Sequence, residues 1–395
     1  MYVKRQLDLS KILRKKSYFL FGPRQTGKTS LIQHTLNEYR YYNLLQTDVY
    51  LKLSRAPQRL RQEITDDDKI VIIDEIQRLP ILLDEVHNLI EKKGIHFLLT
   101  GSSARKLRNM GVNLLGGRAR TRRLRPFILK ELKKDFQLVK ALDAGLIPSI
   151  YFSDEPFEDL EAYTGNYLRE EIAAEAIVRN VSAFSRFLSV AGLCNGKMIN
   201  YTNIASDAQV PRSTVQEYFQ ILRDTLLGDD LPAWRKSVKR KPVSTSKFYF
   251  FDIGVARFLQ GRRGLKVRSP EFGEAFEAYI HHEIRSYCDY KGGCDLCYWR
   301  ATSGFEVDFV INGKTAIEVK GKANITGKDL KGLTAIKEEE LLENYILVTL
   351  EDTPRRDGDI CILPWKDFIF ALAQSDSTRL FSSYTFSDNS SLSNA

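Results

Sequence analysis

The 395-residue chain is 43% hydrophobic, which excludes a disordered or collagen-like chain. Its formal net charge of +9 favours polyanionic partners such as DNA. No apolar stretch approaches the ~20 residues of a membrane span, and the N-terminus has no apolar signal core, so we expect a cytoplasmic protein without a membrane partner. The five scattered cysteines argue against a disulfide framework and fit reduced thiols.

The first apolar strand runs into a glycine-rich loop and then a helix, in the stretch SYFLFGPRQTGKTS. This loop completes the pattern G-x-x-x-x-G-K-[ST], in which backbone N–H groups surround phosphates and the lysine reaches the β- and γ-phosphates. Thr29 would supply a hydroxyl ligand to Mg²⁺. The predicted ATP-binding residues are Gly22, Pro23, Arg24, Gln25, Thr26, Gly27, Lys28, Thr29 and Ser30.

A second strand is predicted at Tyr41–Leu45, and a later, fully apolar strand, Ile70–Ile73, ends in two acidic residues, Asp74 and Glu75. Ligands bind at the carboxyl ends of strands in open α/β sheets, so we expect these side chains beside the phosphate loop. Asp74 would hold Mg²⁺ through water, and Glu75 would polarise the attacking water. A further strand, in HFLLTGSS, ends near Thr100 and Ser102, either of which could contact the γ-phosphate.

Arg118 follows two glycines in the stretch LLGGRARTRRLRPF. Its permanently charged guanidinium suits the charge that develops on a transferring phosphoryl group. Arg118 would then be catalytic, and the active unit would be a homo-oligomer if it acts in trans. The alternative is a basic surface, because further arginines alternate along the predicted strand.

The segments GPRQTGKTSL, VIIDEIQRLP and LLTGSSARKL…LGGRA, in this order, resemble one group of prokaryotic AAA-superfamily ATPases. Members of that group carry a C-terminal domain of unknown function. The resemblance extends to about residue 370. It implies a P-loop core with an extra strand between the two Walker strands, and it implies ATP binding and hydrolysis.

The middle of the chain contains a predicted helix-turn-helix in NYTNIASDAQVPRSTVQEYFQILRDTLL. Apolar residues of the second helix recur at helical spacing from Val215 to Leu226. The segments LPAWRKSVKRKP and STSKFYFFDIGVARFL would supply the strands of a wing. Two interpretations stay open: the second helix enters a DNA groove with Arg212, Ser213, Gln216 and Gln220 exposed, or the module is a lid or protein-contact domain.

A hairpin is predicted in EVDFVINGKTAIEVKGK, with Asn312-Gly313 as the turn signal. A three-residue loop pairs Asp308 with Glu318 and puts the charged residues on one face, with the apolar residues on the other. Directly opposed carboxylates repel each other, so a divalent metal is expected to neutralise them. Lys320 lies two residues beyond Glu318 and could stabilise charge on a scissile phosphate.

This D…ExK arrangement resembles the PD-(D/E)XK nuclease superfamily, although Val307 stands where the proline of that signature would be. The resemblance implies that Asp308, Glu318 and Lys320 are catalytic, and that Glu277, on the preceding helix, is a further metal ligand together with Asp308 and Glu318. Many proteins of this fold bind nucleic acid without cutting it. An ion pair between Glu306 and Lys320 would be the plain structural alternative.

The expected fold class is α/β, with an AAA-type P-loop parallel sheet core, a helical and winged-helix middle domain and a restriction-endonuclease-like C-terminal domain. The predicted boundaries are 1–155, 156–265 and 266–372, followed by a Ser-rich mobile tail at 373–395. The expected function is an ATP- and Mg²⁺-dependent ATPase that acts on DNA through a metal-dependent nuclease-like domain. The alternative is an ATP-dependent switch that binds DNA or a protein partner without cleavage.

Overall fold

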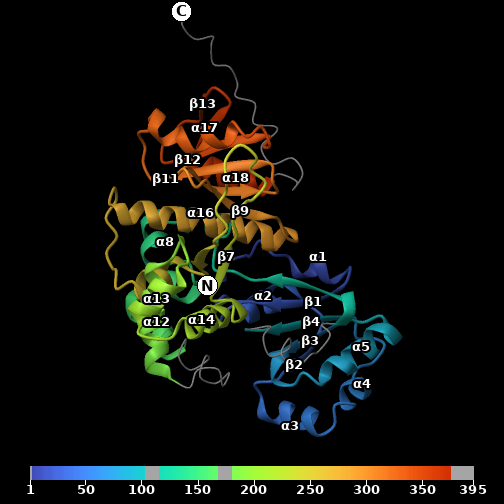
Figure 1. Cartoon of the computed structure of the whole chain (residues 1–395). Coiled ribbons are helices and arrows are strands. Elements are labelled where there is room, and N and C mark those ends of the chain that lie inside the picture. Colours follow the sequence, from blue (N-terminus) through green and yellow to red (C-terminus); the bar gives the residue numbers. More distant parts are fainter. Residues whose placement is uncertain (1, 103–114, 168–179, 375–395) are drawn as a thin grey trace, which may run out of the picture. The chain divides into compact units, whose positions relative to one another are not determined.

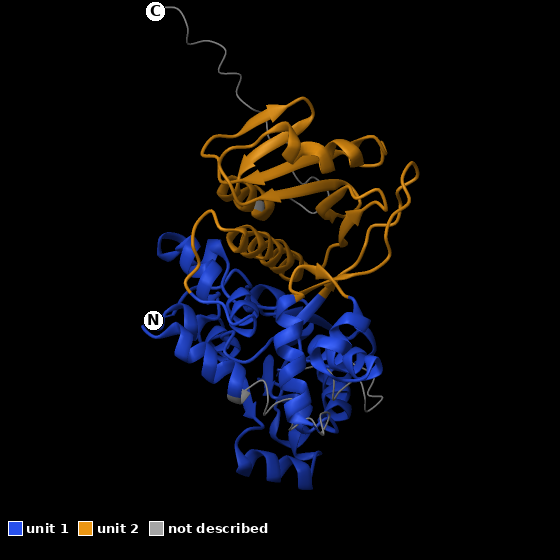
Figure 2. Ribbon diagram, turned by 60° about the vertical axis from the view of Figure 1, so that its left-hand side comes forward, with its two compact units in different colours: residues 1–193, 200–229, 250–263 blue, residues 194–199, 230–249, 264–395 orange. Residues whose placement is uncertain are grey.

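The computed structural model describes residues 2–102, 115–167 and 180–374, and the chain divides into two compact units (Figure 2). Unit 1 comprises residues 1–193, 200–229 and 250–263, and unit 2 comprises residues 194–199, 230–249 and 264–395. The predicted Ser-rich tail lies outside the described residues from residue 375 onward. Among the described residues, no helix is both long and apolar enough to cross a membrane.

Unit 1 is built on a parallel sheet (Figure 1). Its five strands lie in the order β2 (Arg40–Asn43), β3 (Ile70–Asp74), β4 (His96–Gly101), β1 (Ser17–Phe21) and β5 (Ala119–Arg123). Every neighbouring pair is parallel. Strand β4 therefore separates the phosphate-loop strand β1 from β3, as the resemblance to AAA-superfamily ATPases implied. The predicted α/β fold class is confirmed.

Helices follow the strands because apolar residues recur at helical spacing and bury one face. In α5, for example, Leu82, Val86 and Leu89 are buried in the same core cluster as Ile73 and Leu99 of the sheet. The helices of this part are α1 (Leu9–Leu13), α2 (Lys28–Thr35), α3 (Thr47–Arg55), α4 (Arg59–Glu63), α5 (Leu82–Lys93), α7 (Leu129–Leu132), α8 (Leu138–Ala144), α9 (Pro148–Tyr151) and α10 (Pro156–Ala162).

The middle of the chain contains a run of helices and short strands. In chain order these are α12 (Val181–Leu193), β6 (Lys197–Met198), α13 (Tyr201–Ala208), α14 (Arg212–Asp224), β7 (Gly228–Leu231), β8 (Lys247–Phe250) and α15 (Ile253–Leu259). The three strands form one sheet in the order β6-β8-β7. Helix α14 buries Val215, Tyr218 and Phe219, as its apolar spacing predicts, and leaves Arg212 and Gln216 exposed.

The segment before β8 differs from the predicted wing strand. Residues 232–246 form no regular strand of their own. Instead, the N–H of Trp234 donates to the carbonyl of Tyr298 at 2.6 Å, and the N–H of Val243 donates to the carbonyl of Arg300 at 2.9 Å. The stretch LPAWRKSVKRKP therefore runs beside a strand of the C-terminal sheet.

Unit 2 contains a six-stranded mixed sheet (Figure 1). Its order is β13 (Arg355–Asp357), β14 (Ile360–Pro364), β12 (Asn344–Thr349), β11 (Thr315–Lys320), β10 (Glu306–Ile311) and β9 (Leu296–Arg300). The helices of this unit are α16 (Pro270–Lys291), α17 (Lys331–Lys337) and α18 (Trp365–Gln374). Apolar residues of α17, including Leu333 and Ile336, pack in one core cluster with Val307 and Leu347 of the sheet.

The cysteines are not all reduced, contrary to the expectation from their spacing. Cys288, near the end of α16, forms a disulfide bond with Cys294, and their Cα atoms are 5.1 Å apart. Cys297, three residues after Cys294, is a separate buried thiol. This disulfide bond links the last turns of α16 to the loop that leads into β9.

Candidate functional site

The predicted phosphate loop connects β1 to the N-terminus of α2 in unit 1. Gly27 adopts a left-handed conformation, with φ of 90°, immediately before the helix begins at Lys28. At Gly22, an added Cβ atom would lie 2.5 Å from the carbonyl oxygen of Leu124, so only glycine fits there. The loop backbone is thereby shaped by close approach to the chain after β5.

Within this loop, the buried ammonium of Lys28 folds back onto the backbone. It donates to the carbonyl of Gly22 at 2.6 Å and to that of Pro23 at 3.2 Å. Thr26 donates from its hydroxyl to the same Pro23 carbonyl at 2.8 Å. The lysine thus lies across the loop, in contact with the groups that would line a phosphate site.

A buried arginine that sequence reasoning missed supports the loop. Arg5 donates to the carbonyl of Thr26 at 2.6 Å and to that of Arg125 at 2.5 Å, and it pairs with the buried Glu131 at 2.9 Å. No local motif surrounds Arg5, so only its tertiary contacts reveal its role. They fix the N-terminal segment beneath the phosphate loop.

Beside the first turn of α2 lies a cavity of about 330 Å³. Its walls include Gly27 and Ser30 of the loop and the aromatic rings of Tyr2, His34 and Phe127. The rings of Tyr2 and His34 stack at 3.8 Å. This combination of apolar rings next to a phosphate loop fits the base of a nucleotide.

Asp74 ends β3, at the edge of the sheet where β1 runs into the loop, and both oxygens of its carboxylate accept from hydroxyl groups. One oxygen accepts from Thr100, and the other accepts from Tyr41 at 2.6 Å. Burial and the hydrogen bond to Asp74 raise the pKa of Tyr41 above its usual value, so its hydroxyl stays protonated. Tyr41, on β2, is a site residue that the sequence did not reveal.

Glu75 occupies a left-handed backbone conformation, with φ of 59°, in the turn after β3. The side-chain amide of Gln77 donates to Glu75 and, at 3.4 Å, approaches the hydroxyl of Ser102. Thr100 and Ser102 therefore have different partners: Thr100 contacts Asp74, whereas Ser102 contacts the glutamine that holds Glu75. Gln77 is a second site residue that the motif did not include.

Arg118 lies at the opposite end of the sheet from the phosphate loop. The parallel register pairs Ala119 with Ser17 and Arg123 with Phe21, so Arg118 precedes the start of β1 and the loop follows its end. At about 3.3 Å per residue, this separates Arg118 from the loop by roughly 20 Å along the strand. Its guanidinium pairs with Glu91 of α5. Arg118 is therefore remote from the ATP site of its own chain.

In unit 2, the predicted hairpin has the predicted register. Strands β10 and β11 pair Phe309 with Ile317 and Ile311 with Thr315, which leaves the expected three-residue loop and sets Asp308 opposite Glu318. The expected separation of polar and apolar faces is wrong, however. Val307 and Val310 pack together in the core cluster with α17, whereas Phe309 lies by His281 of α16.

The cause is an irregularity between β10 and β9. Val307 pairs with Trp299, but Val310 pairs with Cys297, so Asp308 and Phe309 together face one residue of β9. Such a bulge re-aims side chains and is often found next to functional sites. The backbone N–H of Val319 donates to the Asp308 carboxylate at 2.8 Å.

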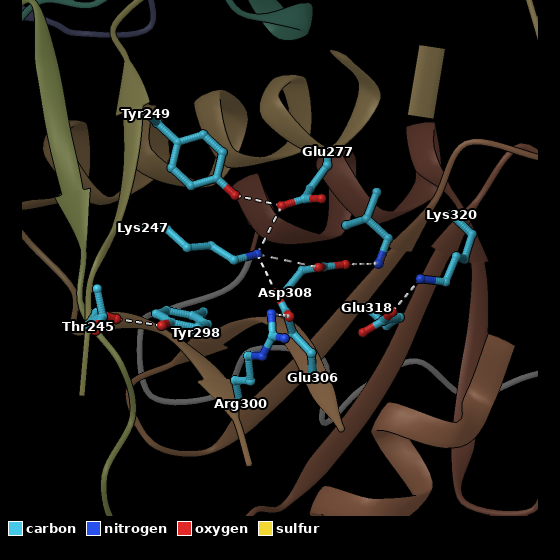
Figure 3. Close-up of polar contacts among 11 residues, drawn as sticks. Thr245, Lys247, Tyr249, Glu277, Tyr298, Arg300, Glu306, Asp308, Glu318 and Lys320 are labelled. Carbon is cyan, nitrogen blue, oxygen red and sulfur yellow. Dashed lines mark hydrogen bonds and ion pairs between the residues drawn. The ribbon is translucent and has the colours of Figure 1, made fainter. Parts of the chain in front are cut away.

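Three acidic residues of α16 and β10 surround a lysine that the sequence did not mark as a site residue (Figure 3). Lys247, on β8, lies 2.7 Å from Glu306, 3.3 Å from Glu277 and 3.9 Å from Asp308. Tyr249, two residues along the same strand, donates its hydroxyl to Glu277 at 2.6 Å. Glu277 is therefore present at the cluster, as predicted, but its carboxylate faces Lys247 and Tyr249.

Lys320 contacts Glu318 rather than Glu306, so the alternative ion pair considered from the sequence is wrong. Glu306 instead pairs with Lys247 and, at 2.9 Å, with Arg300. The second oxygen of Glu318 is buried and has no hydrogen-bond partner. An unsatisfied buried carboxylate oxygen is costly, so it marks the point where a further cation or donor fits.

Burial shifts two carboxylates of this cluster, Asp308 and Glu318, toward the neutral form. Burial, followed by the charge of Glu318, raises the pKa of Asp308 well above its usual value. Burial also raises the pKa of Glu318, to about 7, against the opposing influence of Lys320. Burial alone would lower the pKa of Lys247, but Glu277 and its other neighbours raise it above the usual value.

The predicted metal set does not converge as one group. Among the described residues, no three His, Cys, Asp or Glu side chains come together in a way that could hold a metal. Asp308 and Glu318 remain as an oxygen pair with an unsatisfied atom, which fits Mg²⁺ because that ion often binds through one or two carboxylates and retains several waters. The Glu277 carboxylate instead pairs with Lys247.

Three protein-family models match successive stretches of the chain, and the first two matches overlap at residues 119–133. Residues 14–133 match the family described as AAA domain. Residues 119–266 match a domain of unknown function, DUF8612, and residues 272–368 match another, DUF4143. Neither of these descriptions names an activity.

Similar proteins occur in bacteria and archaea. An uncharacterized protein of Mycobacterium tuberculosis is 23% identical over 301 residues, which cover 74% of this chain and 66% of the relative, so the match spans just under two thirds of that protein. An uncharacterized protein of Methanocaldococcus jannaschii is 22% identical, with 91% of this chain and 85% of the relative covered.

Among solved structures, the replication initiator DnaA bound to AMPPCP and single-stranded DNA has a TM-score of 0.31 at 15% identity, with 56% of this chain and 90% of that chain covered. A structure of two coordinating Pif1 helicases at forked double-stranded DNA has a TM-score of 0.23 at 12% identity, with 46% of this chain and 59% of that chain covered.

Proposed function

We propose that the chain binds and hydrolyses ATP at the phosphate loop and uses this cycle to act on DNA. The observation that carries the proposal is the convergence of the loop, with its buried Lys28, and the Asp74–Glu75 pair. Both follow strands whose carboxyl ends lie at the same edge of one parallel sheet. The match of this region to the AAA domain supports the same reaction.

The residues have distinct tasks in this proposal. Lys28 exchanges its carbonyl partners for phosphate oxygens, and the backbone N–H groups of the loop surround the phosphates. A Mg²⁺ ion held by Thr29 and, through water, by Asp74 would neutralise phosphate charge. Glu75 orients the attacking water while Gln77 holds its carboxylate. Thr100 positions Asp74, and Ser102 is the sensor candidate on the Glu75 side.

Arg118 enters this scheme as a residue supplied in trans. It lies at the far end of the sheet from the loop of its own chain, and it is partly exposed on a surface ion pair. A guanidinium from a neighbouring copy would meet the developing phosphoryl charge without any rearrangement within one chain. The active unit in this proposal is therefore a homo-oligomer.

The DNA-directed part of the proposal rests on unit 2 and on the middle region. Asp308 and Glu318 would hold a divalent cation, which when bound would activate water for phosphodiester hydrolysis. Lys320 lies beside Glu318 and would stabilise charge on the scissile phosphate. The order of helices and strands from α12 to β8, with the sheet order β6-β8-β7, supports a winged-helix module whose α14 contacts DNA.

A second candidate function is an ATP-dependent switch that binds DNA or a protein partner without cutting DNA. The observation that favours it is the charge balance of the cluster. Lys247 already neutralises Glu277 and Glu306, so the site is stable without a metal at that position. In this alternative, the phosphate loop keeps its role and Asp308 becomes part of a binding surface.

Steady-state ATP hydrolysis tests the first part of the proposal. Lys28→Ala should reduce turnover at least about 100-fold, because a charged phosphate contact is lost in the transition state. Glu75→Gln should retain ATP binding but lose hydrolysis to a similar extent. The exposed Lys15→Ala, in the same segment of unit 1, is the matched control and should behave as wild type. Undiminished turnover in Lys28→Ala would refute the site.

A further inference from the structure

The carboxylate cluster of unit 2 has two halves with different partners (Figure 3). In one half, Glu277 and Glu306 both face the Lys247 ammonium, at 3.3 and 2.7 Å. In the other half, Asp308 accepts from the backbone of Val319 and lies farther from the same ammonium, at 3.9 Å, and Glu318 contacts Lys320. Only the second half contains a buried carboxylate oxygen without a hydrogen-bond partner, on Glu318.

The Lys247 side chain is 6% exposed and is held in place from several sides. Its ammonium lies 5.3 Å from the ring centroid of Tyr298, on β9, in a cation–π contact. Tyr249, which donates to the same Glu277 oxygen, stacks on His281 at 3.9 Å. A buried cation in such a frame is a fixed part of the site, because removing it would leave uncompensated carboxylates.

The Lys247 ammonium lies between carboxylates, where a metal ion could otherwise bind. It touches carboxylates from α16 and β10, which are the elements that a second divalent ion would need to bridge. An ammonium and a divalent ion cannot share this position, because both require the same carboxylate oxygens. The Glu277 carboxylate is therefore already neutralised by the Lys247 ammonium.

We propose that Lys247 is a resident cation that replaces one metal ion, so that the cluster takes a single divalent ion, held by Asp308 and Glu318, with Glu277 outside its ligand set. The inference rests on the proposed metal-dependent function of unit 2 and defines its stoichiometry. It also assigns Lys247 and Tyr249 as positioning residues that act through Glu277 and Glu306.

Binding of Mn²⁺ alone to the nucleotide-free full-length protein tests this assignment. Free Mn²⁺ is counted by electron paramagnetic resonance, with Asp74→Asn present in every protein to silence the ATP-site metal. We expect one ion per chain. Glu318→Gln should weaken its binding at least about 10-fold, whereas Glu277→Gln should leave the stoichiometry unchanged. Lys247→Met should raise the count to two, and adding Glu277→Gln to it should return the count to one.

A matched control comes from an exposed lysine of β6 that pairs with a glutamate of the same helix, α16. Lys197 pairs with Glu274 at 3.5 Å, and its side chain is 56% exposed, so Lys197→Met should leave the count at one. Two ions in the Asp74→Asn parent, or loss of the ion in Glu277→Gln, would overturn the inference even if Lys247→Met failed to fold. Absence of any ion in every protein would instead remove the metal-dependent function on which the inference rests.

Discussion

The ATP site and the carboxylate cluster both hold buried charges, but they neutralise them in different ways. At the phosphate loop, Lys28 is held by backbone carbonyls five and six residues away in the chain. In the cluster, Lys247 is held by side chains 30 and 59 residues away, on α16 and β10. A short motif encodes the first arrangement, whereas only the fold assembles the second.

The two sites therefore also differ in how readily the lysine can leave its partners for another ligand. Backbone carbonyls lose little when a lysine leaves them for a phosphate, because they carry no charge. Buried carboxylates lose much more when their cation leaves, since burial penalises an unpaired charge. We therefore expect Lys28 to exchange its carbonyl partners for a ligand readily, and we expect Lys247 to keep its ion pairs with the carboxylates.

The largest effect is expected at Arg118, which tests whether the ATP site is complete within one chain. Arg118→Ala should lower the rate of ATP hydrolysis about 1,000-fold, because a guanidinium is lost from the transition state. Mixing Arg118→Ala with Glu75→Gln should restore part of the activity, since a mixed interface can then hold one intact site. The exposed Arg120→Ala is the control on the same strand. Failure of the mixture to recover activity would refute action in trans.

The next effect tests the buried ion pair beneath the phosphate loop. Arg5→Met should lower the free energy of unfolding by about 3–5 kcal/mol, because Glu131 would be left buried without its partner. Chemical denaturation measures this loss, and the exposed Arg14→Met should stay within about 0.5 kcal/mol of wild type. A loss below about 1 kcal/mol for Arg5→Met would mean that the pair does not support the loop.

A third prediction concerns a buried carboxylate of unit 1 that is held by backbone N–H groups. Asp252 accepts from Leu146 at 2.7 Å and from Val255 at 3.1 Å, yet burial raises its pKa to about 6. The folded protein thus binds a proton that the unfolded chain releases near pH 4. The resulting stabilisation is present below that pH and is lost as the pH rises through about 6.

Asp252→Asn should remove this dependence. Between pH 4 and pH 7, the free energy of unfolding of the variant should gain about 2 kcal/mol relative to wild type. Urea unfolding at both pH values measures the change, and the exposed Asp159→Asn serves as the control. An equal pH dependence in Asp252→Asn and wild type would show that backbone donors fully offset the burial.

The smallest effect concerns the basic segment 235–241, which would contact DNA phosphates if the middle region binds DNA through α14. Lys236 is exposed, whereas Lys239 pairs with Glu340 at 3.3 Å. Lys236→Ala should reduce the slope of log affinity against log salt by about 1, as expected for one lost phosphate contact. Lys239→Ala should change it less, because its charge is already partnered. Equal slopes for Lys236→Ala and wild type would remove this segment from the interface.

The sequence predicts those features whose partners lie close together in the chain. The phosphate loop, the strand that ends at Asp74 and the register of the hairpin follow from contiguous patterns. The bulge at Asp308 does not, because it arises from pairing with β9, and the hairpin alone cannot specify it. Nor can a pattern within the loop identify Arg5, which is 21 residues from the carbonyl of Thr26.

Lys247 illustrates the limit most clearly. Lys247 begins β8, and in the sequence it follows several other basic residues that come after β7. The sequence left open whether this region forms a wing on DNA or a lid or protein-contact domain. Its neighbours Lys239 and Arg240 instead pair with Glu340 and Glu338, next to α17. Charge alone could not separate these residues, because their roles depend on which acidic side chains the fold brings to them.

Cleavage of labelled single- and double-stranded DNA, with Mn²⁺ or Mg²⁺ and with or without ATP, tests the central claim most directly. Wild type would be compared with Lys28→Ala, Asp308→Ala and Lys320→Ala. The account predicts metal-dependent cutting that is lost in Asp308→Ala and Lys320→Ala and loses its response to ATP in Lys28→Ala. No cutting by a wild-type protein that hydrolyses ATP would contradict the nuclease assignment and favour the ATP-dependent switch.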